Sequence, residues 1–516
     1  MNYKFITIVV SVVLLLSCSQ AKKTDIATVS GKVSGFIPVS QNNATVIRLT
    51  VTDVILGEDV EYETLTGKDG IFSFSIPVIS KSIGRIGINA ESYYLAYISL
   101  TPMEESKFEV FFDEKGDKQV NILKGSGFTK SDLEDISTVS MQVLEAYQNR
   151  ASGKQSFSPD IAPEAYKKDI IDEWDELLSI VDNDKNLPAE SKTFIRLPIK
   201  LFYLKNDLLD YKNAMHDRYC LLHDNEEKFN ADDFTPIIPQ KSYYSFLKDF
   251  DLNAIQYVFT NDYYAALQSI LYQEGLNIPA IGDTPVKVWI EAVKANISDL
   301  MGSDSGLFYD LLAAHAYIKQ FNADKTPLSK QQEENIKAYF SNKRFVEVLL
   351  SKNEKCIGIN EDIVALENNK KNTEKIVLPL TINETPSVSK EELMNAIILK
   401  YKGKAVVIDF WATWCAPCLN AMEKTKYFKH EIRDKNVVFV YITDASSPVE
   451  EWKEKIKEIG GEHYYLTEEE WNYLSKTIRF SSIPTYLYYN KNGLLKNKII
   501  SFSSSREMRK MIEELL

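Results

Sequence analysis

The sequence predicts a multidomain protein with an N-terminal β-sandwich, an all-α middle domain and a C-terminal α/β domain. Three observations predict this order. From about Ile26 to Leu123, β-branched and aromatic residues alternate with polar ones, and glycines follow at short spacing. The period then becomes helical from Ser131 to about Ser351. Beyond residue 376, strand-like and helix-like segments alternate, which is typical of a central sheet flanked by helices.

The domain boundaries follow these changes of pattern, and a chain of 516 residues is long enough to bury several cores. The predicted segments are a signal peptide at 1–17, a tether at 18–25, the β-sandwich at 26–124, the helical domain at 128–355, a linker at 356–375 and the α/β domain at 376–516. The formal net charge of −13 argues against a role in binding nucleic acid, because such a role needs a basic surface.

The first residues, "MNYKFITIVVSVVLLLSC", have the pattern of a secretion signal. A basic residue, Lys4, precedes an apolar run that ends at Leu16 and is too short to span a bilayer well. The small residue before Cys18 resembles a bacterial lipoprotein box, which implies cleavage before Cys18, acylation of its sulfur and firm attachment to a membrane. An ordinary cleaved signal with a free Cys18 is the alternative. Either way, we expect the mature protein outside the cytoplasm, and the lipid anchor would hold it on the periplasmic side of a bacterial cell membrane.

The β-region carries a clear inward and outward alternation. In "IFSFSIP", Phe72, Phe74 and Ile76 point one way, and the intervening serines point the other. Nothing in this region has a catalytic pattern, so we interpret it as a spacer or docking module. In the helical region, Ser131 with Glu134 and Ser329 with Gln332 have the spacing of capping boxes, which predicts helix starts at both places.

The stretch "VVIDFWATWCAPC" carries the chemistry. A predicted strand delivers the chain to a helix that begins at Cys415, where amide groups and the helix dipole stabilise a thiolate. The attacking sulfur must be partly ionised and exposed, and Cys418 lies one turn further, within disulfide reach. A zinc site would need further paired ligands; His430 is too far along the helix, so we predict no metal and no cofactor.

Together, "DFWATWCAPC" and the downstream "IPT" resemble the thioredoxin superfamily, and within it the TlpA-like group of membrane-anchored thiol–disulfide oxidoreductases. The resemblance implies that Cys415 is the nucleophile and Cys418 the resolving cysteine. It also implies that Asp409 is the buried acid that moves a proton to or from Cys418. A purely structural carboxylate is the alternative for Asp409.

The same resemblance implies a substrate surface. Pro484 matches the cis-proline that faces the disulfide, which leaves the backbone of Ile483 free to pair with an extended substrate strand. Thr485 and Trp414 are assigned to the same surface, with Trp414 shielding the sulfurs. The chain departs from the family pattern at Glu423, where a helix-kinking proline is usual, and at Ala421, where some relatives carry an acid.

The sequence therefore predicts an enzyme that reduces disulfides in extracytoplasmic proteins and draws electrons from a membrane donor. Two alternatives stay open: a partner-binding lipoprotein whose dithiol is secondary, and a disulfide oxidase or isomerase. Weaker signals are His216, Cys220 and His223 at helical spacing, which packing explains as well as a ligand role. A disulfide between Cys220 and Cys356 is a further open possibility.

Overall fold

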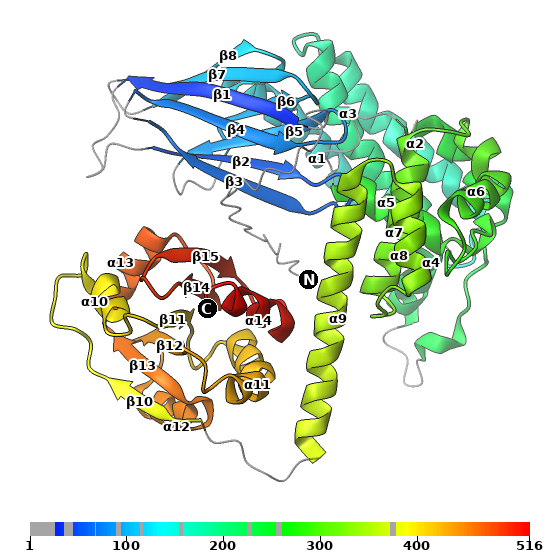
Figure 1. Ribbon diagram of the computed structural model, residues 1–516. Coiled ribbons are helices and arrows are strands. Elements are labelled where there is room, and N and C mark those ends of the chain that lie inside the picture. Colours follow the sequence, from blue (N-terminus) through cyan, green and yellow to red (C-terminus); the bar gives the residue numbers. More distant parts are fainter. Residues whose placement is uncertain are drawn as a thin grey trace. The chain divides into compact units, whose positions relative to one another are not determined.

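The computed structural model describes residues 26–35, 45–67, 69–88, 94–113, 117–153, 158–223, 230–250, 252–253, 261–371 and 378–516 (Figure 1). The predicted signal peptide and Cys18 lie outside these residues. Contacts divide the chain into two compact units. The N-terminal unit holds the strand-rich and helical regions up to Leu350, except residues 325–327, and the C-terminal unit holds residues 351–516.

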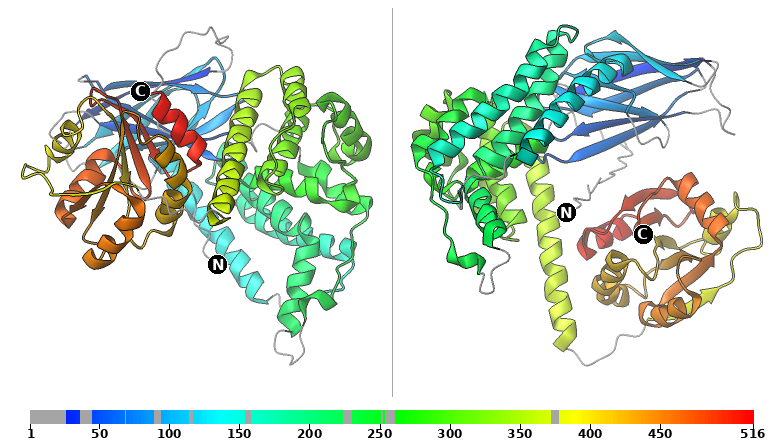
Figure 2. Two further views of the ribbon diagram at one scale, coloured as in Figure 1. Left: turned by 60° about the horizontal axis from the view of Figure 1, so that its bottom comes forward. Right: turned by 180° about the vertical axis from the view of Figure 1, so that it is seen from behind.

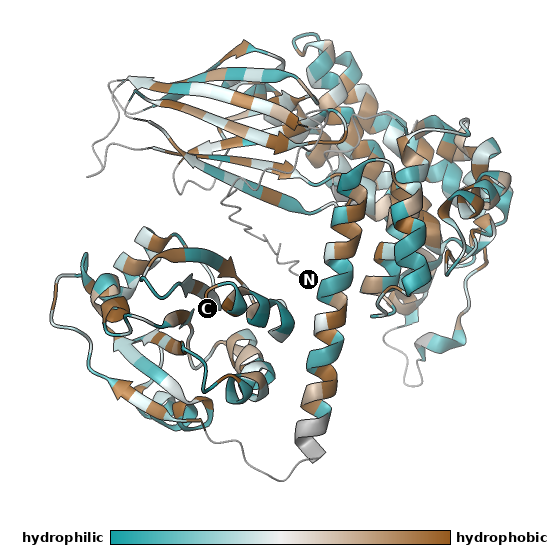
Figure 3. Ribbon diagram, in the orientation of Figure 1, coloured by the Kyte–Doolittle hydropathy of each residue, from teal (hydrophilic) through white to brown (hydrophobic). Residues whose placement is uncertain are grey.

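Two sheets form the strand-rich part of the N-terminal unit, in the orders β4-β1-β7-β8 and β3-β2-β5-β6-β9. Their strands are β1 (Ile26–Gly35), β2 (Val46–Thr52), β3 (Asp59–Leu65), β4 (Ile71–Pro77), β5 (Ser82–Ile88), β6 (Ala96–Leu100), β7 (Glu105–Phe112), β8 (Lys118–Lys124) and β9 (Gly127–Phe128). Side chains of both sheets share one apolar core, as expected for a sandwich. The predicted alternation in β4 is confirmed, because Phe72, Phe74 and Ile76 are buried and the intervening serines are exposed. Bands of higher and lower hydropathy alternate along the strands of the sandwich (Figure 3).

Helices make up the rest of this unit. They are α1 (Lys130–Gly153), α2 (Pro163–Asn183), α3 (Ala189–Tyr203), α4 (Tyr211–His223), α5 (Asn261–Tyr272), α6 (Val286–Met301), α7 (Leu307–Asn322), α8 (Lys330–Tyr339) and the first part of α9 (Lys343–Lys371). Shorter π and 3-10 turns are η2 (Leu204–Leu208), η3 (Ala231–Asp233), η4 (Lys241–Phe250) and η6 (Glu274–Leu276). The capping box of Ser329 and Gln332 at the start of α8 is confirmed.

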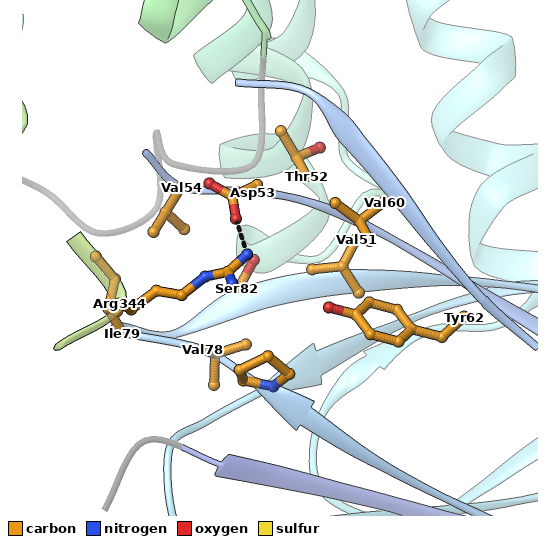
Figure 4. A pocket seen from close by; sticks show the side chains of 11 residues that line it. Val51, Thr52, Asp53, Val54, Val60, Tyr62, Val78, Ile79, Ser82 and Arg344 are labelled. Atoms are coloured by element: carbon orange, nitrogen blue, oxygen red, sulfur yellow. Dashed lines mark hydrogen bonds and ion pairs between the residues drawn. The ribbon is translucent and has the colours of Figure 1, made fainter. Parts of the chain in front are cut away.

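Arg344 of α9 ties this helix to the sandwich. Its Nη2 donates a hydrogen bond to Oδ2 of Asp53 at 2.6 Å (Figure 4). The other carboxylate oxygen of Asp53 accepts the backbone N–H groups of Ile55 and Leu56. The Asp53 side chain is only 7% exposed, so its negative charge depends on these partners.

Replacing Arg344 with alanine is therefore expected to lower the free energy of unfolding by about 1–3 kcal/mol, because a buried carboxylate loses its cation. Urea unfolding followed by circular dichroism measures this loss. Arg196→Ala is the matched control, because Arg196 pairs with Asp182 at the same 2.6 Å but both side chains are at least 40% exposed. That control should cost less than about 1 kcal/mol. Equal losses in the two variants would contradict the argument from burial.

The segment expected as a linker, 356–375, is helical as far as Lys371, because α9 continues through it. The later turns of α9 have partners within the C-terminal unit, which explains why this polar segment is ordered as a helix. The carboxylate of Asp362 accepts the N–H of Ser505 at 3.1 Å, and Arg506 pairs with Glu354 and Glu361.

The C-terminal unit contains a six-stranded sheet in the order β10-β13-β12-β11-β14-β15. Its strands are β10 (Leu380–Asn383), β11 (Ala405–Phe410), β12 (Val437–Asp444), β13 (Gly461–Leu466), β14 (Thr485–Tyr489) and β15 (Leu495–Ile500). The first four strands of that order run parallel, and β14 and β15 pair antiparallel. The chain therefore has the predicted fold class: strand-rich sheets, a helical middle region and an α/β domain.

Helices cover both faces of this sheet (Figure 2). They are α10 (Leu393–Leu399), α11 (Ala416–Glu431), α12 (Val449–Ile459), α13 (Glu468–Ile478) and α14 (Ser505–Glu513). Helices α10 and α13 pack on one face, and α11, α12 and α14 pack on the other. Within the described residues, no helix combines the length and the apolar character needed to cross a membrane.

Candidate redox site

The central strand β11 positions the cysteine pair. All six residues of β11 are buried, and the short loop after it leads directly into α11. Cys415 caps α11, and Pro417 lies in the first turn, where a missing N–H costs no helical hydrogen bond. Cys415 and Cys418 form a disulfide, with their Cα atoms 5.3 Å apart. The Sγ atom of Cys415 accepts the backbone N–H of Cys418 at 3.2 Å. The same N–H would stabilise a thiolate at this position once the disulfide is reduced.

The disulfide lies deeper than the sequence argument expected. Cys415 is 3% exposed and Cys418 is fully buried, although an attacking sulfur was expected to be exposed. Both sulfurs belong to an apolar cluster with Trp411, Met422 and Trp452, which explains the low exposure. Trp411 is thus a core residue. Trp414, by contrast, is 63% exposed directly before Cys415.

The loop before β14 carries the predicted proline. The Ile483–Pro484 peptide bond is cis, and the register of β14 with β11 and β15 begins only at Thr485. We find no backbone hydrogen bond from Ile483 to any other residue that the structure describes. The Thr485 side chain does not fit its predicted role in substrate contact. It is fully buried, and its hydroxyl donates to the carbonyl of Ser482 at 2.7 Å.

Asp409 lies on β11 between Tyr441 of β12 and Tyr486 of β14. It is 4% exposed, and one of its carboxylate oxygens is buried without a hydrogen-bond partner among the described residues. Burial raises the pKa of the Asp409 carboxyl, and the positive charge of Lys429 opposes this shift. A carboxyl that is desolvated in this way can hold a proton near neutral pH, which a proton carrier requires.

Lys429 is a residue that the sequence argument missed. It is 5% exposed on α11, and its Nζ donates to the hydroxyl of Tyr441 at 2.7 Å. Burial lowers the pKa of its amine, and Asp409 opposes this shift. A signal was available, because the buried stripe of α11 includes Cys418, Met422 and Thr425 and reaches Lys429 at helical spacing. A lysine in such a stripe needs a polar partner.

The exposed indole of Trp414 is held in place. Its Nε1 donates to Oγ of Ser446 at 3.2 Å, and that hydroxyl donates to Asp444 at 2.6 Å. The indole forms one wall of a groove of about 750 Å³, which we call the indole groove. Trp471, Phe480 and Ile483 are among the other residues that line it.

The weaker signals do not assemble into a site. Cys220 Sγ lies 3.8 Å from Nδ1 of His216, and no group of three or more His, Cys, Asp or Glu side chains in the described part of the chain could hold a metal ion. Cys220 and Cys356 are both free thiols, so the possible disulfide between them is not formed.

The geometry and the comparisons with known proteins agree on the class of this domain. Residues 403–494 match a family model described as thioredoxin-like. The C-terminal α/β domain is therefore a thioredoxin-like domain, as the motif predicted, of the kind found in thiol–disulfide oxidoreductases.

Particular relatives match this part of the chain. The thioredoxin-like protein YneN of Bacillus subtilis is 28% identical over 134 residues, which are 25% of this chain and 73% of the relative. The thiol-disulfide oxidoreductase ResA of Geobacillus thermodenitrificans is 22% identical over 117 residues, 22% of this chain and 65% of the relative. A solved thioredoxin domain of a thiol-disulfide oxidoreductase from Bacteroides vulgatus is 16% identical with a TM-score of 0.21, covering 23% of this chain and 84% of that one.

Proposed function

We propose that this protein reduces disulfide bonds of proteins outside the cytoplasm by exchange with the Cys415–Cys418 pair. The observation that carries the proposal is the disulfide at the amino end of α11, with Sγ of Cys415 accepting the N–H of Cys418. The pair can store two electrons, and Asp409 supplies a buried carboxyl on the adjoining strand. No further cofactor is required for thiol–disulfide exchange.

The exchange proceeds in two steps. In the reduced protein, the Cys415 thiolate attacks a substrate disulfide, forms a mixed disulfide and releases one substrate sulfur as a thiolate. Cys418 then loses its proton, for which Asp409 is the acceptor, and attacks Sγ of Cys415. The Cys415–Cys418 bond forms, the second substrate sulfur leaves, and two electrons have passed to the substrate.

The setting of this reaction is part of the proposal. The basic, apolar and cysteine-ending pattern before Ser19 supports export and attachment of a lipid to Cys18. The reducing direction needs a membrane dithiol that returns electrons to the oxidised pair. The substrates are disulfide-containing extracytoplasmic proteins.

Equilibration with mixtures of reduced and oxidised glutathione tests the direction of the reaction. We expect a reduction potential of about −270 mV, as in reducing thioredoxins, whereas a value of about −120 mV would identify an oxidant. Alkylation and mass spectrometry of the peptide that contains Cys415 and Cys418 report the redox state. This readout keeps the free thiols of Cys220 and Cys356 out of the measurement.

A further inference from the structure

The indole groove lies between helix α13 and Trp414, the residue directly before Cys415. Trp471 and Phe480 form an apolar floor with their rings 5.7 Å apart, and Ile483 adds an aliphatic side chain next to the cis-proline. A volume of about 750 Å³ is large enough for several side chains of a peptide, and it exceeds what one small disulfide compound needs.

The Trp414 wall is rigid for so exposed a side chain. The hydrogen bonds from its indole to Ser446, and from Ser446 to the buried Asp444, fix its orientation. An aromatic wall that is already ordered loses little conformational entropy when a partner packs against it. The groove is therefore prepared to receive an apolar side chain.

The charge of the groove has one sign. Among the described residues that line it, Asp444 and Glu468 are acidic, and none is Lys or Arg. Asp444 is engaged with Ser446, whereas Glu468 is exposed in the first turn of α13 and makes no ion pair with a described residue.

The neighbours of Glu468 are already engaged. Glu469 pairs with Lys390, and Glu470 accepts the N–H and hydroxyl of Thr467 in a capping box. An anionic ligand at the start of α13 would face this acidic turn and a capped helix end, so the groove favours a cation over an anion.

From these features we infer that the indole groove binds an extended segment of a disulfide-bonded polypeptide that carries a large apolar side chain beside a Lys or Arg. The apolar side chain packs on Trp471 and Phe480 against the Trp414 wall. The basic side chain lies next to Glu468. This assignment of a substrate class rests on the proposed reductase function, because it places the segment against Trp414, the residue directly before the reacting Cys415.

The backbone of Ile483 supports an extended conformation for this segment. It lies outside the ladder of β14, and it has no hydrogen bond to the described backbone. An extended segment can pair with it and direct alternate side chains into the groove and away from it. Glu468 and the apolar floor then act on neighbouring positions of one bound segment.

The test compares peptides that differ in one residue. Ten-residue peptides carry Phe next to a single cysteine, which is held as a mixed disulfide with 2-mercaptoethanol. Lys, Gln or Glu is placed on one side of this pair and then on the other. We measure kcat/KM for their reduction by the full-length protein, which a chemical dithiol returns to the reduced state after each turnover. Hydroxyethyl disulfide is the small uncharged substrate for comparison. We expect the Lys peptide to be preferred by about threefold over Gln and by about tenfold over Glu.

Three variants locate this preference. Glu468→Gln should reduce the discrimination between the Lys and Glu peptides to about twofold or less, whereas Glu469→Gln, one residue away and outside the groove, should leave it unchanged. Trp414→Ala should raise KM for every peptide by about fivefold. Glu468→Gln and Glu469→Gln should reduce hydroxyethyl disulfide at the wild-type rate, which shows that the thiol chemistry is intact.

The outcomes separate the two proposals. Equal kcat/KM values for the Lys and Glu peptides, or an equal effect of Glu468→Gln and Glu469→Gln, would overturn the groove assignment while reductase activity stands. If even hydroxyethyl disulfide is not reduced, the proposed function fails. Binding of fluorescent peptides with Ser in place of Cys, measured by anisotropy, then decides the groove assignment, since the preference for Lys must persist there.

Discussion

Cys415→Ser is expected to abolish disulfide reduction by this protein, to the level of the uncatalysed background. The serine hydroxyl is not ionised near neutral pH, so the N–H of Cys418 at the start of α11 would have no anion to stabilise. The remaining sulfur, Cys418, is fully buried in the oxidised structure and cannot take over the attack. Reduction of a protein disulfide by pre-reduced protein, with a chemical dithiol to recycle it, measures the effect.

Cys418→Ser is expected to fail at a different step. Cys415 can still attack a substrate, but Cys418, the sulfur that is bonded to Cys415 in the oxidised protein, is no longer there to resolve the mixed disulfide. The variant should therefore accumulate covalent complexes with its partners, which non-reducing electrophoresis and mass spectrometry detect. Cys415→Ser should give none of these complexes.

Cys220→Ser is the matched control for both variants. Cys220 is a free, half-buried thiol in the N-terminal unit, and its loss should leave turnover and trapping at wild-type levels. Residual turnover of more than a few per cent in Cys415→Ser, or trapping in both variants of the pair, would contradict the assignment of Cys415 as the nucleophile.

The regular parts of the fold could be predicted because their patterns reflect burial directly. In β4, alternate residues face the core of the sandwich, and a period of two in the sequence reports this. The start of α1 was harder to locate. The helix begins at Lys130, and Asp132 accepts the N–H and hydroxyl of Thr129, two residues before the predicted cap at Ser131. Both sets of residues fit the capping pattern, and only the tertiary structure selects between them.

The linker was misjudged for a related reason. The residues near the end of α9 are polar and charged, and in isolation they would read as exposed chain. Asp362 is nevertheless buried, and it binds the start of α14, which lies more than a hundred residues further on. A partner so distant in sequence leaves no local periodicity to detect.

The candidate site likewise has some residues that the sequence predicts and others that only the tertiary structure reveals. Cys415, Cys418 and Pro484 occur in short motifs, so their positions could be read from the sequence. The partners that set the electrostatics could not, because Lys429 and Tyr441 meet only when α11 packs on β12. The inward orientation of the Thr485 hydroxyl is likewise decided by the loop at Ser482.

Asp409→Asn is expected to slow the resolving step by about a hundredfold near neutral pH, because the proposed mechanism uses Asp409 as the acceptor of the Cys418 proton. Rapid mixing of the reduced variant with a peptide disulfide should show normal formation and slow decay of the mixed disulfide. A merely structural role for Asp409 would slow both phases or neither.

The same substitution should stabilise the oxidised protein. Burial raises the pKa of Asp409, so as pH rises above the usual carboxyl range the unfolded chain loses this proton while the folded protein keeps it. The unfolded state then binds fewer protons, and the free energy of unfolding falls with increasing pH. Asparagine carries no such proton. Asp409→Asn should thus gain about 2 kcal/mol in urea unfolding, with the largest gain above neutral pH.

Lys429 contributes to the pH dependence of stability with the opposite sign to Asp409, and Lys429→Met tests this. Burial lowers the pKa of the Lys429 amine, so below the usual lysine range the unfolded chain binds more protons than the folded protein. This contribution makes stability rise with pH. In Asp409→Asn only the lysine contribution remains, so stability should rise from neutral pH to about pH 9. In Lys429→Met only the carboxyl contribution remains, and stability should fall over the same range.

Tyr441→Phe is the control for this pair, because it removes the hydroxyl that accepts from Lys429 without removing either charge. Its pH dependence should stay close to that of the wild-type protein. The opposite slopes of the two charge variants depend on the burial of both groups, Asp409 on β11 and Lys429 on the disulfide-bearing helix α11. Parallel slopes in Asp409→Asn and Lys429→Met would show that the two groups titrate as exposed residues, and the proton carrier assigned to Cys418 would have to be sought elsewhere.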